Sequence, residues 1–328
     1  MNNNIEKIKQ QSAEKIKQLS AGLDATSKSR DTDDPLEVRF HEPVGYVFML
    51  FFKKIGFTPN MVTILSAIVG FAGGWLFISG SFWIRLMGVL LSILAIILDC
   101  TDGQLARATG KTSELGRLLD GGATIAAYAA QYIAVGIKMM HEPVFYTNLI
   151  WGGWCWLMII PCAVLLHANQ CRMADYFRNL HLFFLLGSEE SELDSSEELQ
   201  RRYEAEKAKG FSFKVFYMFI YIRYTRMQEM LTPNLQRFFA VAGRDTAAYS
   251  DEMRADFVTR SRKYIQLTNV LTINLRAYIL FVLVLIGQHE WFFPALLIME
   301  IINAFMIYQY EKIMKNMLTT YFPGGNEE

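Results

Sequence analysis

Three aspartates in one short segment have the side chains and the spacing for binding a cation. Asp99 and Asp102 are three residues apart, so on a helix they share one face, and Asp120 follows after a loop and can face them. Three carboxylates without a histidine or cysteine form an all-oxygen ligand set, which suits Mg²⁺ or Mn²⁺ rather than Zn²⁺. The sequence therefore predicts a metal site with the ligands Asp99, Asp102 and Asp120.

Two glycines and an arginine surround these acids. Gly103 directly follows Asp102, and Gly116 lies four residues before Asp120. Because glycine has no Cβ, each position lets a flat ligand or another backbone come close. Arg107 has a guanidinium fork that suits a diphosphate. Together with the metal, these residues predict a pyrophosphate-bearing nucleotide held beside the acids.

The acids lie at the end of a long apolar run, where carboxylates are costly unless they bind something. Of the 328 residues, 52% are hydrophobic, and the 22 Gly, 8 Pro and 4 Cys exclude collagen-like and disulfide-scaffold classes. Six stretches are long and apolar enough to cross a bilayer. They are residues 61–80, 82–101, 119–140, 144–169, 267–287 and 290–311. We therefore predict an all-α integral membrane protein with a bundle of six transmembrane helices.

The basic residues predict the orientation of this bundle. With six spans and an internal N-terminus, all of the 32 Lys and Arg residues except Arg85, Lys138 and Arg276 lie on one side. This asymmetry is typical of cytoplasmic loops, so we expect both termini and the aspartates at the cytoplasmic face of a multi-pass protein. Because 32 acidic residues balance the basic ones, no global basic field favours nucleic acid as a partner.

The polar regions divide the chain into four parts. Residues 1–42 form a cytoplasmic N-terminal arm, with an amphipathic helix and a solvated arm as open alternatives. Residues 43–170 hold an interfacial helix, which Pro59 breaks, and the first four spans. Residues 171–265 are a cytoplasmic or interfacial insertion, for which we expect helices on the inner leaflet, with a re-entrant seventh element as the alternative. Residues 266–328 hold the last two spans and the C-terminal tail.

The segment LDCTDGQLARATGKTSELGRLLDGGAT resembles the signature of the CDP-alcohol phosphotransferases, D-x-x-D-G-x-x-A-R-x8-G-x3-D-x3-D. Seven positions match at that spacing: Asp99, Asp102, Gly103, Ala106, Arg107, Gly116 and Asp120. The six spans, with this segment joining the second and third, and the TPNMVT entry to the first span are also similar to the family.

The resemblance implies a fold, a reaction and partners. The reaction is transfer of a substituted phosphate from a CDP-linked lipid or alcohol to an alcohol acceptor, with release of CMP, in phospholipid biosynthesis. Two metal ions, Mg²⁺ or Mn²⁺, would neutralise the diphosphate. Membrane lipids and a homodimer are the implied partners. The nucleotide-binding residues implied for this chain are Asp99, Gly103, Ala106, Arg107, Ser113, Gly116, Asn60 and Thr63.

One position departs from the family signature. The fourth aspartate, which the resemblance implies as the base for the acceptor hydroxyl, is replaced by Thr124. A threonine hydroxyl is a poor metal ligand and no general base near neutral pH. Three interpretations stay open: an engineered substitution, a natural variant with a base from elsewhere, and a protein that has lost catalysis and binds CDP-lipid or a partner. The resemblance implies two catalytic positions, Asp120 and Thr124, and the base of the family is replaced at the second.

The acceptor site is expected to use basic residues. Arg276 lies inside the fifth predicted span, and Arg117 follows Gly116. Either guanidinium fits the phosphate of inositol phosphate or glycerol phosphate, and the alternative for Arg276 is pairing with an internal acid. A transporter is disfavoured, because the acids lie at a helix end rather than at mid-membrane.

Overall fold

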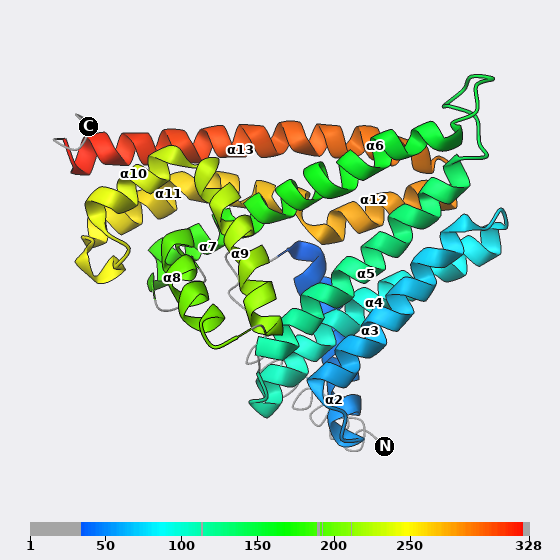
Figure 1. The fold of residues 1–328 in the computed structure, drawn as a ribbon, viewed down its shortest axis with the longest axis horizontal. Helices are drawn as coiled ribbons and strands as arrows, with labels where there is room; N and C mark the ends of the chain where they lie inside the picture. The colour runs from blue at the N-terminus through cyan, green and yellow to red at the C-terminus, as the bar shows by residue number, and fades with distance from the viewer. Residues whose placement is uncertain (1–33, 113, 189–190, 192, 211, 324–328) are drawn as a thin grey trace, which may run out of the picture. The chain divides into compact units, whose positions relative to one another are not determined.

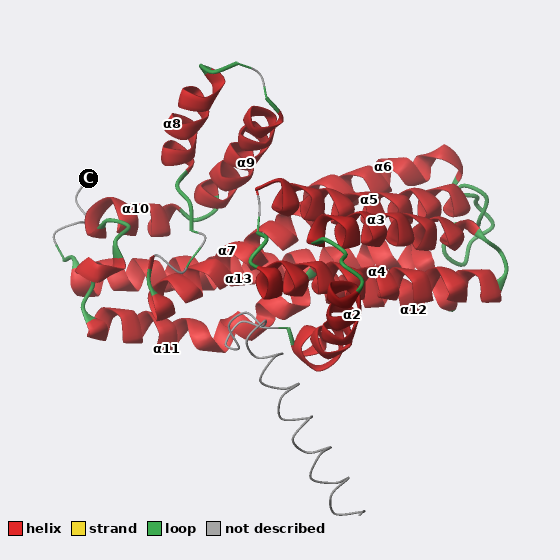
Figure 2. Cartoon of the chain, turned by 90° about the horizontal axis from the view of Figure 1, so that it is seen from below, coloured by secondary structure: helices red, strands yellow, loops and turns green. Residues whose placement is uncertain are grey.

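The structure is a computed structural model that describes residues 34–112, 114–188, 191, 193–210 and 212–323. Within these ranges the elements are helices joined by loops, apart from an isolated bridge between Pro143 and Ile150 (Figure 2). The all-α prediction is therefore confirmed for the described residues. Most of the predicted N-terminal arm, residues 1–33, lies outside them. The chain divides into two compact units, Met1–Cys155 and Trp156–Glu328.

Four helices in the described ranges are long and apolar enough to cross a membrane. They are Pro59–Ile78, Phe82–Thr109, Gly152–Leu186 and His289–Tyr321. A fifth candidate is the pair Asp251–Leu271 and Ile273–Leu285, which is bent by 41°. The helices thus fit a multi-pass membrane protein, with four or five candidate spans where the sequence predicts six.

Each difference from the six predicted spans has a local cause. The third span lies in α5 (Glu114–Met139), whose many Ala and Gly residues contribute little hydrophobicity. The fourth is expected from residue 144, but the helix begins at Gly152 and runs past residue 171 to Leu186. The fifth is broken at Thr272, which has extended backbone. The remaining α12 (Ile273–Leu285) has 13 residues, a length of about 20 Å against the roughly 30 Å of a hydrocarbon core.

The first unit is built around α3 (Pro59–Trp75), which packs along both α4 (Phe82–Thr109) and α5 (Figure 1). Glycines on α3 make this approach close. A Cβ built at Gly73 would lie 2.8 Å from the carbonyl oxygen of Gly88 and the amide nitrogen of Ser92, and one at Gly70 would lie 2.8 Å from the Cβ of Ala127. Small residues at helix contacts are how membrane helices gain packing energy without a hydrophobic driving force.

A second contact fixes the end of α4 that carries the acids. The helix α2 (Glu42–Lys54) packs on α4 and is preceded by the short π-helix η1 (Glu37–His41). Gln104 donates a buried hydrogen bond of 3.1 Å to the carbonyl of Glu42, and Thr101 donates one of 3.3 Å to that of Gly45. A cluster of buried apolar side chains joins α2, α3 and α4: Met49, Phe52, Val62, Leu98 and Leu105.

The sequence analysis predicts that Pro59 ends the interfacial helix, but the structure places the break earlier. The helix ends at Lys54, and Gly56 turns the chain with a φ of 81°. Pro59 is instead the first residue of α3, where its missing N–H costs nothing. The predicted interfacial helix is therefore shorter than residues 43–60.

The second unit contains α6 (Cys155–Pro161, in this unit from Trp156), α7 (Ala168–Leu186), α8 (Ser196–Lys207), α9 (Phe213–Met230), α10 (Pro233–Ala242), α11 (Asp251–Thr268), α12 and α13 (Phe292–Tyr321). Its core is aromatic. Phe177 stacks on Tyr310 and Phe184 on Phe257, each with ring centroids 4.0 Å apart, which joins α7 to α13 and to α11. Between α6 and α7 the chain forms a π-helix, Cys162–His167, directly after Pro161, which lacks the N–H for a regular turn.

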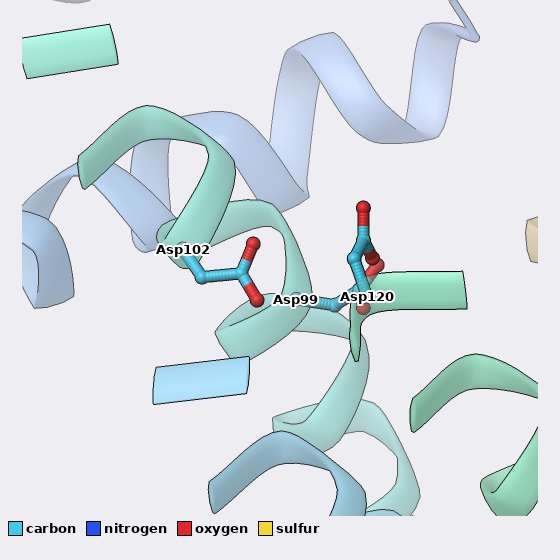
Figure 3. A group of neighbouring side chains, drawn as sticks. All are labelled: Asp99, Asp102 and Asp120. Carbon is cyan, nitrogen blue, oxygen red and sulfur yellow. The ribbon is translucent and has the colours of Figure 1, made fainter. Parts of the chain in front are cut away.

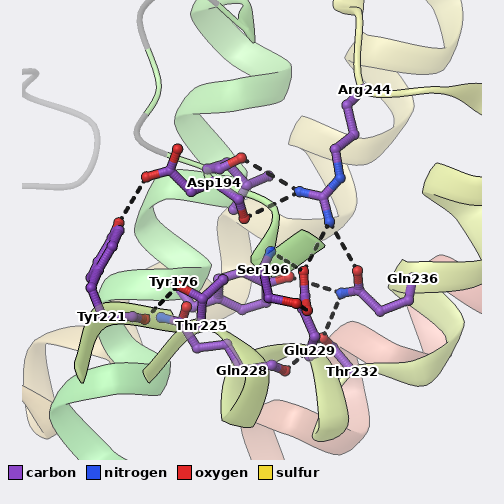
Figure 4. Close-up of polar contacts among 11 residues, drawn as sticks. Tyr176, Asp194, Ser196, Tyr221, Thr225, Gln228, Glu229, Thr232, Gln236 and Arg244 are labelled. Atoms are coloured by element: carbon purple, nitrogen blue, oxygen red, sulfur yellow. Dashed lines mark hydrogen bonds and ion pairs between the residues drawn. The ribbon is translucent and has the colours of Figure 1, made fainter. Parts of the chain in front are cut away.

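A polar network holds the hairpin of α8 and α9 to α10 (Figure 4). The Arg244 guanidinium donates to the carbonyls of Leu193 and Asp194, to Gln236 and to the carboxylate of Glu229. Glu229 also accepts hydrogen bonds from the backbone and hydroxyl of Ser196, at the start of α8. These contacts lie within the predicted insertion 171–265, whose helical character is seen in its described residues.

Candidate metal centre

Two helix ends define the region of the aspartates. α3 begins with Thr58 as N-cap, whose hydroxyl accepts from the amide of Met61, and Pro59 follows at the first helical position. α4 ends at Gly110, which adopts the left-handed conformation at φ 63°, and the Lys111 amide bonds back to the carbonyl of Ala106. This is the usual glycine-terminated helix end. Asp99 and Asp102 thus lie in the last turns of α4.

The three aspartates converge (Figure 3). One carboxylate oxygen each of Asp99, Asp102 and Asp120 lies within 4.8 Å of the other two. Asp102 is buried, and the other two are half-buried. Asp99 and Asp102 come from α4, and Asp120 comes from the first turns of α5, so the loop between the helices brings the acids together as the sequence predicts.

Carboxylates this close repel one another, and burial in apolar surroundings strengthens the repulsion. A divalent cation relieves it and accepts carboxylate oxygens at 2.0–2.6 Å, as Mg²⁺ and Ca²⁺ sites show. Three oxygens within 4.8 Å of one another are near enough to share such an ion. The residues present therefore fit a divalent metal of the hard, oxygen-preferring class.

Thr63 is directly hydrogen-bonded to this cluster. Its buried hydroxyl donates a short hydrogen bond to Asp102 Oδ2, and lies 3.1 Å from the carbonyl oxygen of Pro59. The sequence places Thr63 among the nucleotide-binding residues but gives no partner for it. In the structure Thr63 fixes the orientation of the Asp102 carboxylate, and so links the first turn of α3 to the acids.

Thr124 lies where the signature has its fourth aspartate. It is one helical turn after Asp120 on α5, and its hydroxyl oxygen lies 3.4 Å from Asp99 Oδ1. The side chain is half-buried and points at the cluster. The position is thus part of the site in space as well as in sequence, with a hydroxyl in place of a carboxylate.

Gly103 and Arg107 are adjacent on α4. A Cβ at Gly103 would lie 3.5 Å from Nη1 of Arg107, in ordinary van der Waals contact, so the guanidinium lies beside Gly103. Arg107 is exposed, and Ala106 is half-buried one turn beyond Asp102 on the same face. Gly103, Ala106 and Arg107 thus follow Asp102 within the next two turns of α4, and their role in nucleotide binding stays a prediction.

For the other predicted residues near the acids, the structure describes the position of Asn60 and Gly116. Asn60 is half-buried in the first turn of α3, close in sequence to Thr63, and Gly116 is half-buried in α5. Ser113 lies outside the described residues. Arg117 lies in α5, but its side chain is not among those described.

Arg276 is in the second unit and is fully buried. Its guanidinium donates to Gln170 Oε1 at 2.9 Å, to the carbonyl of Leu271 at 3.0 Å and to Cys171 Sγ at 2.9 Å. Gln170 in turn donates to Glu300 Oε2 at 3.0 Å. The Gln170 amide therefore connects Arg276 to the internal acid Glu300. This arrangement is close to the predicted alternative, in which Arg276 pairs with an internal acid.

Gln104 and Thr101 were not singled out from the sequence. Both are fully buried in α4, Thr101 between Asp99 and Asp102 and Gln104 two residues after Asp102, and both bond the backbone of α2. The signal available was a glutamine and a threonine inside an apolar stretch, where polar side chains require partners. Their partner helix is distant in sequence, so periodicity does not reveal it.

Residues 57–187 match the sequence model of the CDP-alcohol phosphatidyltransferase family. This part of the chain is similar to that family. The matched segment contains all three aspartates, Thr63 and Thr124. The family resemblance seen in the sequence is therefore confirmed.

Two relatives are named for their products. The chain is 30% identical over 113 residues to an archaetidylinositol phosphate synthase of Aeropyrum pernix, covering 34% of this chain and 53% of the relative. It is 38% identical over 89 residues to an archaetidylinositol phosphate synthase of Pyrococcus horikoshii, covering 26% and 43%. The chain thus spans about half the length of these relatives. No solved structure matches it.

Proposed function

We propose that the protein is a membrane transferase that moves a substituted phosphate group from a CDP-linked lipid to an alcohol and releases CMP. The observation that carries this proposal is the convergence of Asp99, Asp102 and Asp120 within 4.8 Å, inside the segment that matches the model of the CDP-alcohol phosphatidyltransferases. The two relatives named as archaetidylinositol phosphate synthases support an inositol phosphate as the acceptor. Glycerol phosphate is the second acceptor to test.

The metal site is proposed to hold Mg²⁺ or Mn²⁺, as a pair of ions. Asp99, Asp102 and Asp120 would be the ligands, and the bound ions would neutralise the charge of the diphosphate and of the leaving CMP. Thr63 orients the Asp102 carboxylate for this role through its hydrogen bond. Gly103 and Arg107, which lie side by side on α4, are proposed to line the nucleotide pocket, with the Arg107 guanidinium binding a phosphate.

Further residues are proposed for the nucleotide pocket and for the acceptor site. Ala106, Gly116, Asn60 and Ser113 complete the proposed nucleotide pocket, and Arg117 is the proposed acceptor residue of the first unit. Arg276 is a weaker acceptor candidate, because two of its nitrogens are engaged by Gln170, Leu271 and Cys171. Its hydrogen bonds favour a structural role within the second unit.

Six spans with both termini and the acids at the cytoplasmic face remain our proposal for the topology. The asymmetry of the Lys and Arg residues supports it. Under this arrangement α5 crosses the membrane despite its modest hydropathy, since its Ala and Gly residues suit close packing against α3. The homodimer implied by the resemblance is likewise a proposal.

The direct test is CMP release. The purified chain in detergent is incubated with CDP-diacylglycerol, Mg²⁺ or Mn²⁺, and inositol phosphate or glycerol phosphate, and the product lipid is identified by mass spectrometry. We expect CMP and a phosphatidyl-alcohol phosphate in equal amounts, both dependent on the metal. If neither this chain nor Thr124→Asp releases CMP with any of the acceptors, the transferase assignment is overturned.

A binding role is the second candidate, and Thr124 is the observation that favours it. With a hydroxyl 3.4 Å from Asp99 in place of a fourth carboxylate, the site keeps three metal ligands but lacks the base expected for the acceptor. Metal-dependent binding of a CDP-lipid without CMP release from either form would support this candidate.

A further inference from the structure

A hollow in the second unit is lined by basic side chains that the proposed reaction does not use. It has a volume of about 140 Å³, many times the space that one water needs, and lies between α11 and α13. Its polar wall consists of Arg260, Lys263 and Tyr264 from α11 and Gln309, Lys312 and Asn316 from α13. The two helices pack on each other, so the hollow is bounded by helical backbone on two sides.

The charges around this hollow do not balance. Arg260 is paired with Asp256, at 2.6 Å on the same helix. Lys263 and Lys312 have no carboxylate partner in the part of the chain that the structure describes. The nearest acid in sequence to Lys312 is Glu311, whose carboxylate accepts the amides of Asn234 and Leu235 on α10, at 2.8 and 3.3 Å. Two lysine charges therefore remain at the hollow without a counter-ion from the protein.

The uncharged side chains form a defined wall. The Tyr264 hydroxyl donates to Gln309 Oε1 at 3.0 Å, which ties the two helices together at the hollow. Lys263 lies over the Tyr264 ring, 4.8 Å from its centroid. Gln309 and Asn316 also line the hollow, and their side chains have amide N–H groups, from which an anion accepts hydrogen bonds as it does from lysines.

The hollow lies where α13 changes character. From Phe292 to Tyr310 the helix is mostly apolar, and its polar side chains before Tyr310 are Glu300, Asn303, Tyr308 and Gln309. From Glu311 on the helix carries the charged residues Lys312 and Lys315. Lysine and tyrosine at the end of an apolar helix are typical of the level of lipid headgroups. Phosphates of anionic lipids are concentrated at that level, and soluble phosphates reach it from water.

We infer that the hollow formed by Arg260, Lys263, Tyr264, Gln309, Lys312 and Asn316 binds a phosphate-bearing anion, through Lys263 and Lys312. The phosphate can belong to the headgroup of an anionic phospholipid or to a soluble phosphate, because both offer the same oxygens to the same donors. In either case the anion would supply the counter-charge that the protein lacks there, and would connect α11 to α13.

The test compares two double variants with the same loss of charge. Lys263→Gln with Lys312→Gln removes the two unbalanced lysines. Arg262→Gln with Lys315→Gln removes two charges from the same helices at positions that do not line the hollow. All three proteins are checked for folding by gel filtration and circular dichroism. Because Lys263 and Lys312 are exposed, both variants should fold like the parent.

Two probes distinguish the source of the phosphate. In the first, native mass spectrometry measures the phosphatidylglycerol retained by each protein after release from nanodiscs of phosphatidylglycerol and phosphatidylcholine. In the second, inorganic phosphate is added in detergent, with chloride at equal ionic strength as reference, and the melting temperature is followed. We expect the hollow variant to lose about tenfold in the affected probe, as the loss of two charge-assisted bonds implies, and the control variant to match the parent.

The outcomes are separable. Reduced lipid retention in the hollow variant alone supports a lipid phosphate, and loss of the phosphate-induced rise in melting temperature in that variant alone supports a soluble phosphate. Equal behaviour of the two double variants in both probes overturns the proposal. CMP release is not a readout here, so failure of the proposed transferase activity leaves this test unaffected.

Discussion

The hydroxyl oxygen of Thr124 lies 3.4 Å from Asp99 Oδ1, at the position where the family signature has an aspartate. A carboxylate there would add both a ligand and a base to the three acids. We expect Thr124→Asp to raise the rate of CMP release by about 100-fold, which is the low end of what a positioned general base contributes. The rate is measured with CDP-diacylglycerol and inositol phosphate at saturating Mn²⁺.

Thr124→Asn is the matched control for this substitution. It has the shape of aspartate but no charge and no basic oxygen, so it should leave the rate near that of the parent. If the parent and Thr124→Asp turn over equally fast, the base comes from another residue, and the signature position is not the catalytic one in this chain.

Asp102→Asn is expected to abolish divalent-metal binding. Asp102 is the buried member of the three acids, and its removal leaves two half-buried carboxylates for the ion. Binding of Mn²⁺ is followed by electron paramagnetic resonance, and CDP binding is measured with and without EDTA. Asp251→Asn, in the exposed first turn of α11, should bind the metal like the parent. Nucleotide binding that is indifferent to EDTA would contradict the metal assignment.

Thr63→Val removes the hydrogen bond to Asp102 without changing the size of the side chain much. We expect Mn²⁺ affinity to fall by about tenfold, because groups that orient a metal ligand typically contribute that much. Thr63→Ser retains the hydroxyl and should restore most of the affinity. A loss of the same size in both variants would show that packing at this buried position, rather than the hydroxyl, matters.

Gly73→Ala should destabilise the protein by about 2 kcal/mol, since the new Cβ would meet the backbone of α4 at 2.8 Å and force the helices apart. Gly122→Ala is the control, because a Cβ there meets nothing within 4 Å and alanine favours a helix. Thermal unfolding in detergent measures both. An unchanged melting temperature for Gly73→Ala would mean that α3 and α4 are not in contact at their backbones.

Arg276→Met tests whether this residue is structural or binds the acceptor. Its loss leaves Gln170 Oε1 and the carbonyl of Leu271 without their donor, so we expect a loss of about 2 kcal/mol in stability. Gln170→Leu should cost a similar amount, and the double variant less than the sum of the two. A raised KM for the acceptor at unchanged stability would instead support the acceptor role.

The sequence predicted the clustering of the acids better than the fold around them. Asp99, Asp102, Asp120 and Thr124 follow a fixed spacing on two consecutive helices, and helical geometry with one loop is enough to bring them together. The hydrogen bond from Thr63 to Asp102 joins different helices, and its existence depends on how α3 packs on α4. Spacing along the chain carries no information about that contact.

The spans show the same limit. Apolar stretches located α3, α4 and α13 correctly, because their hydropathy is high over a whole span. The break at Thr272 was missed, since an isolated threonine in an apolar run does not distinguish a bent helix from a straight one. The continuation of the helix through residue 171 was missed because polar residues such as Asn169 and Gln170 find partners inside the unit, on Glu300.

The glycines of α3 have a consequence for any lipid that reaches the aspartates. Where Gly73 meets the backbone of Gly88 and Gly70 meets Ala127, the gap between neighbouring helices is narrower than an acyl chain. A hydrocarbon tail therefore cannot pass between the helices at these two contacts, which excludes them as a route for the proposed lipid donor. The same packing that holds the helices together would thus restrict the direction of lipid entry.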